Sequence, residues 1–290
     1  MKPDITRPSV LRELLGRHGF TLKKQLGQNF LIDSHALDSI VDAADIHADT
    51  SVIEIGPGAG VLTTRLAERA ARVLAVEKDE SLRPVLEEVL SGTDNVTLLF
   101  ADALEVSLED WVGQHWGEVK RLVVAANLPY YITTPLLFHI LESNLPVSDM
   151  VILVQKEVAD RLLAKPGGKD YGVLTVMAQW RAEVQRVVNV SANCFLPPPT
   201  VESSVVRLAV RSQPPYPLQR EAALRKVVRA AFGMRRKTLD NALAGGLSLS
   251  KSAVTHLLAC AQIDGKRRGE TLDLQEFARL ANAFVENGVQ

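Results

Sequence analysis

Short runs of β-branched and aliphatic residues alternate with helical patterns through the first half of the chain. The helical stretches carry apolar residues three or four positions apart, as in Leu62 with Leu66 and Leu82 with Val85. The apolar runs between them are predicted strands, at residues 51–55, 72–77, 96–100, 121–126 and 150–154. Such alternation is typical of βαβ units in a sheet covered on both faces. The pattern predicts a doubly wound α/β domain, which binds ligands beyond the carboxyl ends of its strands.

The pattern changes beyond Asp170. The period of residues 171–180 does not distinguish a helix from a strand, whereas residues 184–190 and 204–210 are predicted strands. A proline-rich loop, Phe195-Leu-Pro-Pro-Pro-Thr200, joins these two strands.

A second proline-rich segment, Gln213-Pro-Pro-Tyr-Pro217, predicts a stiff break in the chain. The residues that follow it have a helical and basic pattern. We therefore expect an α/β domain over residues 1–212 and a small helical domain over residues 213–290.

Composition and charge narrow the class of protein. The chain has 290 residues, of which 47% are hydrophobic and 23% charged, so it contains enough apolar material for a full core. No apolar run reaches the roughly 18–20 residues that a membrane helix needs, and the N-terminus lacks the apolar stretch of a secretion signal. Cys194 and Cys260 form no CxxC pair, which favours a reducing compartment and argues against a zinc site. We expect a soluble cytoplasmic protein without a metal.

Positive charge is concentrated near the C-terminus. The formal net charge of the chain is -1, yet residues 213–268 carry eleven Lys and Arg against three Asp and Glu, a charge of +8. This asymmetry is compatible with a polyanionic partner of the helical domain and equally with solvated helix faces.

The turn after the first predicted strand is Glu54-Ile-Gly56-Pro-Gly58-Ala-Gly60. Glycines in such a turn let the backbone bend sharply and approach a ligand closely. The dinucleotide fingerprint G-x-G-x-x-G needs a third glycine at position 61, where this chain has Val61. The turn therefore favours a cofactor with an adenosine and no phosphates over a dinucleotide.

Two acidic residues follow the next two predicted strands. Glu77 is placed where a carboxylate accepts hydrogen bonds from ribose hydroxyls, and Asp102 is placed to accept the amine of an adenine. Either residue alone is better explained by a helix cap or a solvated loop. With the glycine turn, the set indicates S-adenosylmethionine.

The fourth predicted strand ends in Asn127-Leu128-Pro129-Tyr130, a sequence suited to chemistry on an adenine amine. The lone pair of that amine is delocalised into the ring, and acceptors for both of its hydrogens release the lone pair for attack. The Asn127 side-chain oxygen and the Leu128 carbonyl can be those acceptors, while Pro129 stiffens the backbone. Tyr130 offers a ring on which a flipped base stacks. In an unrelated fold the same residues would form an ordinary turn.

These motifs resemble those of the small-subunit ribosomal RNA adenine N6,N6-dimethyltransferase family, and the match runs from about Lys23 to the C-terminus. The residues that carry it form five groups besides Glu77 and Asp102: Lys24-Gln-Leu-Gly-Gln-Asn-Phe-Leu31, the glycine turn 54–60, Asn127–Tyr130, Phe195-Leu-Pro-Pro-Pro-Thr-Val-Glu-Ser203 and Phe232-Gly-Met-Arg-Arg-Lys-Thr-Leu239. The resemblance implies a Rossmann-like methyltransferase domain with a small helical C-terminal domain.

The resemblance also assigns roles. Residues 1–50 would contain a segment that folds over the cofactor site, and the cofactor would contact Asn29, Leu31, Gly56, Gly58, Glu77, Asp102 and Asn127. Asn127, Leu128, Pro129 and Tyr130 would form the catalytic loop, with Phe195 stacking on the adenine opposite Tyr130. The basic C-terminal domain would hold RNA phosphates through Arg225, Arg229, Arg235, Arg236 and Lys237.

The predicted reaction is an in-line transfer of the sulfonium methyl group, driven by positioning and desolvation without a metal or a covalent intermediate. The resemblance implies dimethylation of two adjacent adenines in the 3′-terminal hairpin loop of 16S rRNA, within a partly assembled 30S particle, by a monomer.

Two other functions share these motifs: dimethylation of a large-subunit adenine, which confers antibiotic resistance, and a role chiefly in ribosome assembly. Leu26 and Gly27 and the long basic C-terminal domain favour the small-subunit family. A nicotinamide oxidoreductase is disfavoured by Val61.

Overall fold

The computed structural model describes residues 4–23, 27–130, 132–234 and 236–288. The chain divides into two compact units: Met1–Ala159 with Glu183–Val210, and Asp160–Ala182 with Arg211–Gln290.

The expected boundary before residue 213 lies close to the division after Val210, but the second unit also contains Asp160–Ala182, which the sequence pattern assigned to the catalytic domain. Part of this segment forms helix α8 (Val173–Arg181), which packs on α9 (Glu221–Gly233). The Tyr171 hydroxyl donates to the Leu272 carbonyl at 2.8 Å. Contacts between residues so far apart in sequence leave no local signal, so the pattern alone did not reveal this membership.

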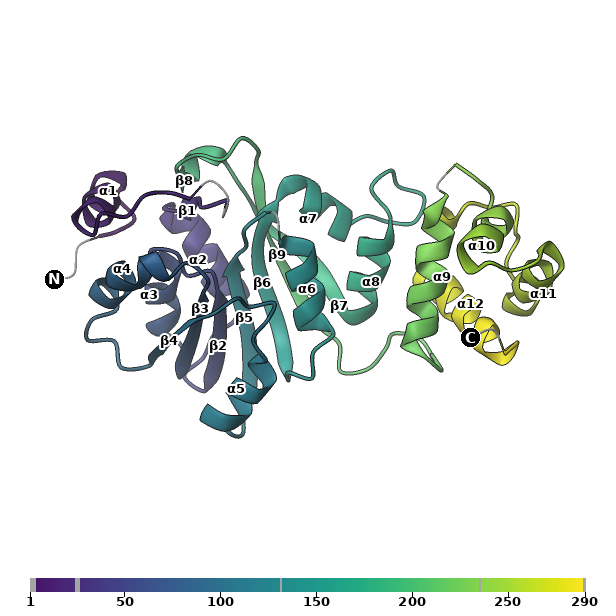
Figure 1. Cartoon of the computed structure of the whole chain (residues 1–290), viewed down its shortest axis with the longest axis horizontal. Helices are drawn as coiled ribbons and strands as arrows, with labels where there is room; N and C mark the ends of the chain where they lie inside the picture. The colour runs from purple at the N-terminus through teal and green to yellow at the C-terminus, as the bar shows by residue number, and fades with distance from the viewer. Residues whose placement is uncertain (1–3, 24–26, 131, 235, 289–290) are drawn as a thin grey trace. The chain divides into compact units, whose positions relative to one another are not determined.

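A seven-stranded sheet forms the centre of the first unit (Figure 1). Its strands are β2 (Thr50–Ile55), β3 (Arg72–Glu77), β4 (Val96–Phe100), β5 (Arg121–Asn127), β6 (Val147–Gln155), β7 (Ala182–Val190) and β9 (Ser203–Val210). The strand order is β4-β3-β2-β5-β6-β9-β7. The first five of these strands are parallel, and β9 is antiparallel to β6. Every strand that the apolar runs predicted is confirmed.

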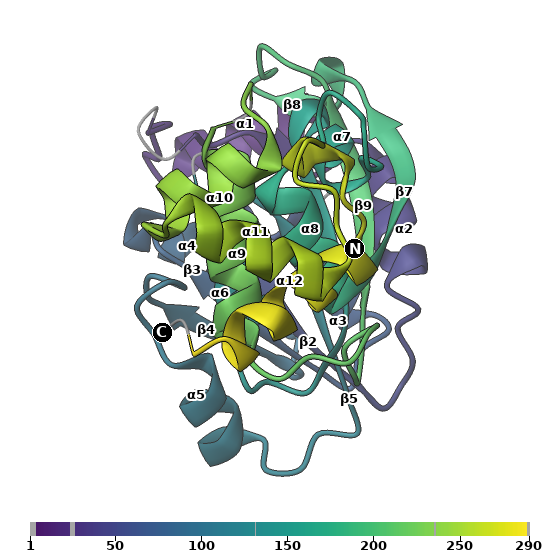
Figure 2. The same cartoon turned by 90° about the vertical axis from the view of Figure 1, so that its right-hand side faces the viewer.

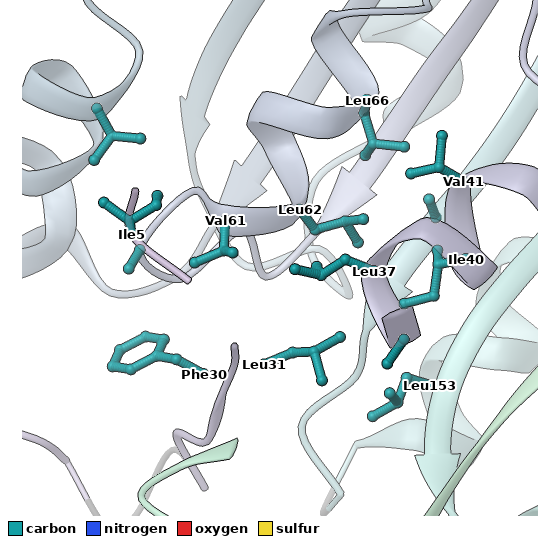
Figure 3. Close-up of a cluster of buried hydrophobic side chains, with 14 of the residues drawn as sticks. Ile5, Phe30, Leu31, Leu37, Ile40, Val41, Val61, Leu62, Leu66 and Leu153 are labelled. Carbon is teal, nitrogen blue, oxygen red and sulfur yellow. The ribbon is translucent and has the colours of Figure 1, made fainter. Parts of the chain in front are cut away.

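Helices complete the βαβ pattern of this unit: α1 (Pro8–Arg17), α2 (Ser34–Ala43), α3 (Val61–Ala67), α4 (Arg83–Val89), α5 (Leu108–His115), α6 (Thr133–Leu141) and α7 (Lys156–Leu162), which continues into the second unit. All six residues of β2 are buried, as a strand covered on both faces requires. One hydrophobic cluster unites α1 to α4 with alternate residues of the strands. In Figure 3, Leu37 of α2 and Leu62 of α3 lie beside Leu31.

Leu31 belongs to a second, two-stranded sheet that the sequence did not predict. Strand β1 (Phe30–Leu31) pairs antiparallel with β8 (Phe195–Leu196), with Leu31 opposite Phe195. Ile32 N–H extends this pairing with a 2.9 Å hydrogen bond to the Cys194 carbonyl. Strands of two residues are too short to show a period, which explains why they were missed.

The second unit is helical, as expected of the C-terminal region. It contains α8 and α9, followed by α10 (Leu239–Leu247), α11 (Lys251–Ala261) and α12 (Leu274–Glu286). Figure 2 shows α9 to α12 facing the viewer, and α9 packs against both α10 and α12. A Cβ atom on Gly246 would lie 2.7 Å from Ala230, so the approach of α10 to α9 requires glycine there. No helix within the described residues is long and apolar enough to cross a membrane.

Candidate active site

A pocket lies at the carboxyl ends of the central parallel strands, where this class of sheet binds its ligands. Including its open mouth and the solvent in it, the pocket encloses about 990 Å³. The predicted cofactor residues and the predicted catalytic loop all line it: Asn29, Leu31, Gly56, Gly58, Glu77, Asp102, Asn127, Leu128, Pro129 and Tyr130. These residues come from positions 29 to 130, and the fold brings them to one place.

The glycine turn follows β2 and opens α3 with a tight bend. Gly56, Gly58 and Gly60 have φ angles of 71°, 58° and 81°, a region that favours glycine. A Cβ atom on Gly58 would lie 2.9 Å from the ring of Phe30. The turn therefore needs glycine both for its backbone conformation and for the close approach of the segment that contains Phe30.

Glu77 lies at the end of β3 and is almost fully buried. Its Oε2 accepts the Gly58 N–H at 3.1 Å, and its Oε1 accepts the Asp79 N–H at 2.8 Å. Burial raises the pKa of the Glu77 carboxyl, and these backbone hydrogen bonds oppose the rise. The two amides hold the carboxyl group at the pocket wall, where its remaining lone pairs can accept ribose hydroxyls.

Asp102 follows β4 and forms an ion pair with Lys78, whose Nζ lies 2.5 Å from Oδ2. The Lys78 hydrogen bond lowers the pKa of Asp102, and the Leu104 N–H adds to this effect at Oδ1. Asp102 is therefore an ionised acceptor for an amine. Among the described residues that line the pocket, Lys78 is the single basic side chain. Because it is already paired, the described lining of the pocket offers no free cation to a pyrophosphate.

Glu54 is a pocket residue that the sequence analysis did not single out. Its side chain is buried in β2 and lines the pocket, and its Oε2 has no hydrogen-bond partner among the described residues. Burial raises the pKa of this carboxyl from 4.5 to about 8. The signal was present in the sequence, since Glu54 is the one acid within the apolar run of residues 51–55.

The segment of residues 27–31 lines the pocket from outside the large sheet. Asp79, at the start of the turn after β3, fixes this segment: its Oδ2 accepts Gln28 Nε2 at 2.7 Å and its Oδ1 accepts Lys23 Nζ at 2.5 Å. The Lys23 N–H also donates to Gln28 Oε1 at 2.9 Å. Lys24, Gln25 and Leu26 of the same motif lie outside the described residues.

The catalytic loop is anchored at both of its ends. Asn127 ends β5, and its Nδ2 donates to the Asn29 carbonyl at 3.0 Å. The Leu128 N–H donates to the Leu153 carbonyl of β6 at 3.2 Å. Further along the loop, the Tyr130 hydroxyl lies 2.8 Å from Ser203 Oγ, at the start of β9. Asn127 is thereby tied to the segment that the resemblance places on the cofactor.

Phe195 does not lie where the resemblance places it. Its side chain is 2% exposed, belongs to the hydrophobic cluster and is not among the residues that line the pocket. The pairing of β8 with β1 draws the ring into the core. Stacking on a base requires Phe195 to leave this cluster.

The predicted RNA-binding residues lie in the second unit. Arg225 is half-buried on α9, whereas Arg229, Arg236 and Lys237 are exposed. Arg235 lies outside the described residues.

The donor set of the pocket fits S-adenosylmethionine. Glu77 and Asp102 supply acceptors for a ribose and an adenine, and the glycine turn allows close approach. The described lining residues include no unpaired basic side chain that would favour a phosphate. This pocket on this sheet defines a Rossmann-like methyltransferase domain.

Comparison with known proteins identifies the family. The model of the family described as "Ribosomal RNA adenine dimethylase" matches residues 19–282. The chain is 48% identical to the "Ribosomal RNA small subunit methyltransferase A" of Geobacillus thermodenitrificans, over 98% of each chain, and 45% identical to that of Bacillus licheniformis, over 99% of each.

Solved structures agree with this result. A dimethyladenosine transferase from Plasmodium falciparum is 25% identical, with a TM-score of 0.75 over 90% of this chain and 98% of that one. The 23S rRNA methyltransferase ErmE is 28% identical, with a TM-score of 0.66, and the match covers 88% of this chain and 99% of ErmE.

The chain belongs to the ribosomal RNA adenine dimethylase family. It is an rRNA adenine dimethyltransferase, and its methyl donor is S-adenosylmethionine.

Proposed function

We propose that the protein dimethylates the N6 amines of two adjacent adenines in the 3′-terminal hairpin loop of 16S rRNA. Its partner is a partly assembled 30S particle in the cytoplasm, which it binds as a monomer, and the reaction accompanies assembly of the small subunit. The names of the relatives at 45–48% identity support the small subunit, whereas ErmE, named for 23S rRNA, shares 28%.

The observation that carries the chemistry is the orientation of Asn127. Because Nδ2 donates to the Asn29 carbonyl, the amide is fixed with Oδ1 as the group that remains to accept a hydrogen. An adenine amine in the pocket donates one hydrogen to this oxygen and the other to the Leu128 carbonyl, which localises its lone pair. S-adenosylmethionine supplies the electrophilic methyl group when bound. The surplus proton of the amine passes to water.

The residues around Asn127 hold this arrangement in place. Pro129 fixes its own φ angle, and its carbonyl accepts the Ile132 N–H at 3.1 Å, so the backbone that presents the Leu128 carbonyl is rigid. Glu77 and Asp102 orient the nucleoside of the cofactor, and Tyr130 stacks on the target base. Catalysis by positioning of this kind needs a rigid loop.

Phe195 completes the stacking in the proposal, by leaving its cluster when the base enters. Exposing a buried aromatic side chain costs about 1.5–3 kcal/mol, and stacking a base on such a ring contributes about 1–3 kcal/mol. The two terms are of the same size, so binding of the base can offset the exposure.

Phosphates of the RNA are held by the basic residues of the second unit, namely Arg225, Arg229, Arg235, Arg236 and Lys237. Contacts to phosphates position an RNA without reading its sequence. Selection of the target adenines then depends on the pocket and on the shape of the particle.

Transfer of labelled methyl groups to under-methylated small subunits, large subunits and free rRNA tests the proposal. We expect label on small subunits alone, recovered as N6,N6-dimethyladenosine. Label on large-subunit RNA would support the second candidate, which the structural similarity to ErmE favours. Absence of label on every substrate, with cofactor binding intact, would leave a role in assembly alone.

A further inference from the structure

Tyr130 and Ser203 are 73 positions apart in sequence, and their hydroxyl oxygens lie 2.8 Å apart. Tyr130 is half-buried in the catalytic loop, where it lines the pocket. Ser203 is fully buried and does not line the pocket. The hydroxyl pair therefore connects a side chain that lines the pocket with one that does not.

Ser203 is a rigid partner for this contact. It is the first residue of β9, which lies between β6 and β7 in the sheet, and it pairs with Gln155 of β6. The preceding residue, Glu202, accepts the Lys156 N–H through its carbonyl at 2.9 Å. Tyr130, in contrast, belongs to no helix or strand. The Ser203 hydroxyl, which the sheet holds in place, therefore fixes the hydroxyl end of the Tyr130 side chain. The loop that contains Tyr130 holds this side chain less firmly.

We propose that Ser203 is a positioning residue for methyl transfer: its hydroxyl holds the Tyr130 ring at the angle on which the target adenine stacks. The inference rests on the proposed function, because it takes Tyr130 as the stacking ring. Ser203 contributes to the rate although it contacts neither substrate nor cofactor.

The neighbouring Ser204 offers a matched control. It is equally buried, lies on the same strand and has its own hydroxyl hydrogen bond, at 2.8 Å to Asn189 Oδ1 on β7. Ser204→Ala therefore removes a buried hydroxyl and one hydrogen bond from β9 without touching the catalytic loop. A loss that arises only from destabilised structure appears in both serine variants.

The experiment compares Ser203→Ala, Tyr130→Phe, the double variant and Ser204→Ala in methyl transfer to under-methylated small subunits. Loss of one hydrogen bond predicts a fall in kcat of about 3- to 10-fold for each of the first two variants. The kcat of the double variant is no lower than that of the less active single variant, because both changes remove the same contact. KM for the particle and the cofactor Kd change by less than about twofold, since the contact matters to the reacting geometry. Ser204→Ala keeps the wild-type kcat. Thermal unfolding of all four variants shows whether any fall in kcat comes from a loss of stability.

Two results would overturn the inference: a wild-type kcat in Ser203→Ala, or equal losses of kcat in the two serine variants. Tyr130→Leu distinguishes this failure from failure of the proposed function. If Tyr130→Leu is inactive while Ser203→Ala is fully active, Tyr130 stacks without help from Ser203. If Tyr130→Leu also keeps the wild-type kcat, the stacking role of Tyr130 is wrong and the inference falls with it.

Discussion

The two polar atoms of the Asn127 side chain have different partners: Nδ2 donates to the Asn29 carbonyl, and in the proposed reaction Oδ1 accepts a hydrogen of the target amine. We expect Asn127→Ala to lower the rate of methyl transfer by well over about tenfold, because the amine loses one acceptor. Cofactor affinity should change less than the rate does: Glu77 and Asp102 are untouched, and the cofactor side loses the hydrogen bond from Asn127 to the Asn29 carbonyl. Measurement of kcat and of cofactor Kd checks both expectations.

Asn127→Asp tests the Nδ2 donor separately from the Oδ1 acceptor. It keeps an oxygen for the amine but replaces the Nδ2 donor with an acceptor that faces the Asn29 carbonyl. We expect it to lose activity as well, because the side chain turns away from that carbonyl. A wild-type rate in either variant would contradict the role of Asn127.

Glu54 predicts a pH dependence of stability in the protein without its cofactor. Burial raises its pKa from 4.5 to about 8 in the folded protein, so the folded state holds this proton more tightly than the unfolded chain. Between these two values a rise in pH therefore favours unfolding. The destabilisation is absent below about pH 4.5, grows through neutral pH and is complete above about pH 8.

Glu54→Gln should remove this contribution. We expect its thermal midpoint, relative to wild type, to rise steadily from pH 5 to pH 8. Glu13→Gln, at an exposed position of α1, is the control and should follow the wild-type curve. Parallel curves for wild type and Glu54→Gln would show that Glu54 titrates as an exposed carboxyl.

At the scale of elements, the sequence predicted what depends on local pattern. The apolar runs gave the seven strands of the large sheet, and the glycine turn with Glu77 and Asp102 gave the pocket wall. Three features escaped it: the pairing of β1 with β8, the placement of residues 160–182 in the second unit, and the Tyr130–Ser203 contact. Each joins residues that are distant in sequence, and none alters the local spacing of apolar residues.

The pairing of β1 with β8 and the Tyr130–Ser203 contact, together with the hydrogen bond from Asn127 to Asn29, form a closed network of contacts around the pocket. Asn127 binds the backbone of Asn29, Leu31 pairs with Phe195, and the chain after Phe195 leads to Ser203, which contacts Tyr130. Tyr130 and Asn127 belong to the same loop. The cofactor side and the base side of the site therefore share one network, so a change in one element affects the position of the other.

Asp79 is the anchor of the segment at residues 27–31, and its removal should weaken cofactor binding. We expect Asp79→Ala to raise the cofactor Kd by roughly tenfold, since hydrogen bonds to a buried carboxylate are lost and the cofactor must order the segment. Methyl transfer at saturating cofactor should recover most of its rate. Titration of the variant with S-adenosylmethionine measures the change.

Asp42→Ala is the matched control for Asp79→Ala. Asp42 is also paired with a basic side chain, Arg69, at 2.6 Å, but it is exposed and does not line the pocket. Surface ion pairs contribute little, so this variant should bind the cofactor as wild type does. Equal Kd values for the two variants would show that Asp79 does not hold the segment.

At the scale of the whole molecule, the proposed RNA-binding residues and the cofactor pocket differ in charge. The net charge is -1, yet residues 213–268 carry +8, and Arg229, Arg236 and Lys237 are exposed. The pocket has a single basic side chain among its described residues, and that side chain is paired. If the proposal is right, we expect RNA affinity to depend strongly on salt and cofactor affinity to depend on it only weakly.

Arg235→Ala combined with Arg236→Ala should weaken binding to the small-subunit particle at low salt and leave the cofactor Kd unchanged. Each phosphate contact that is lost lowers the slope of log K against log salt by about one, so the double variant should flatten it by about two. Arg17→Ala with Arg69→Ala removes the same charge from exposed positions of the first unit and should leave the slope as it is. If both pairs flatten the slope equally, the total charge of the protein governs the association. If neither pair does, the helical unit does not hold the RNA through these arginines, and the phosphate contacts must be sought elsewhere on the chain.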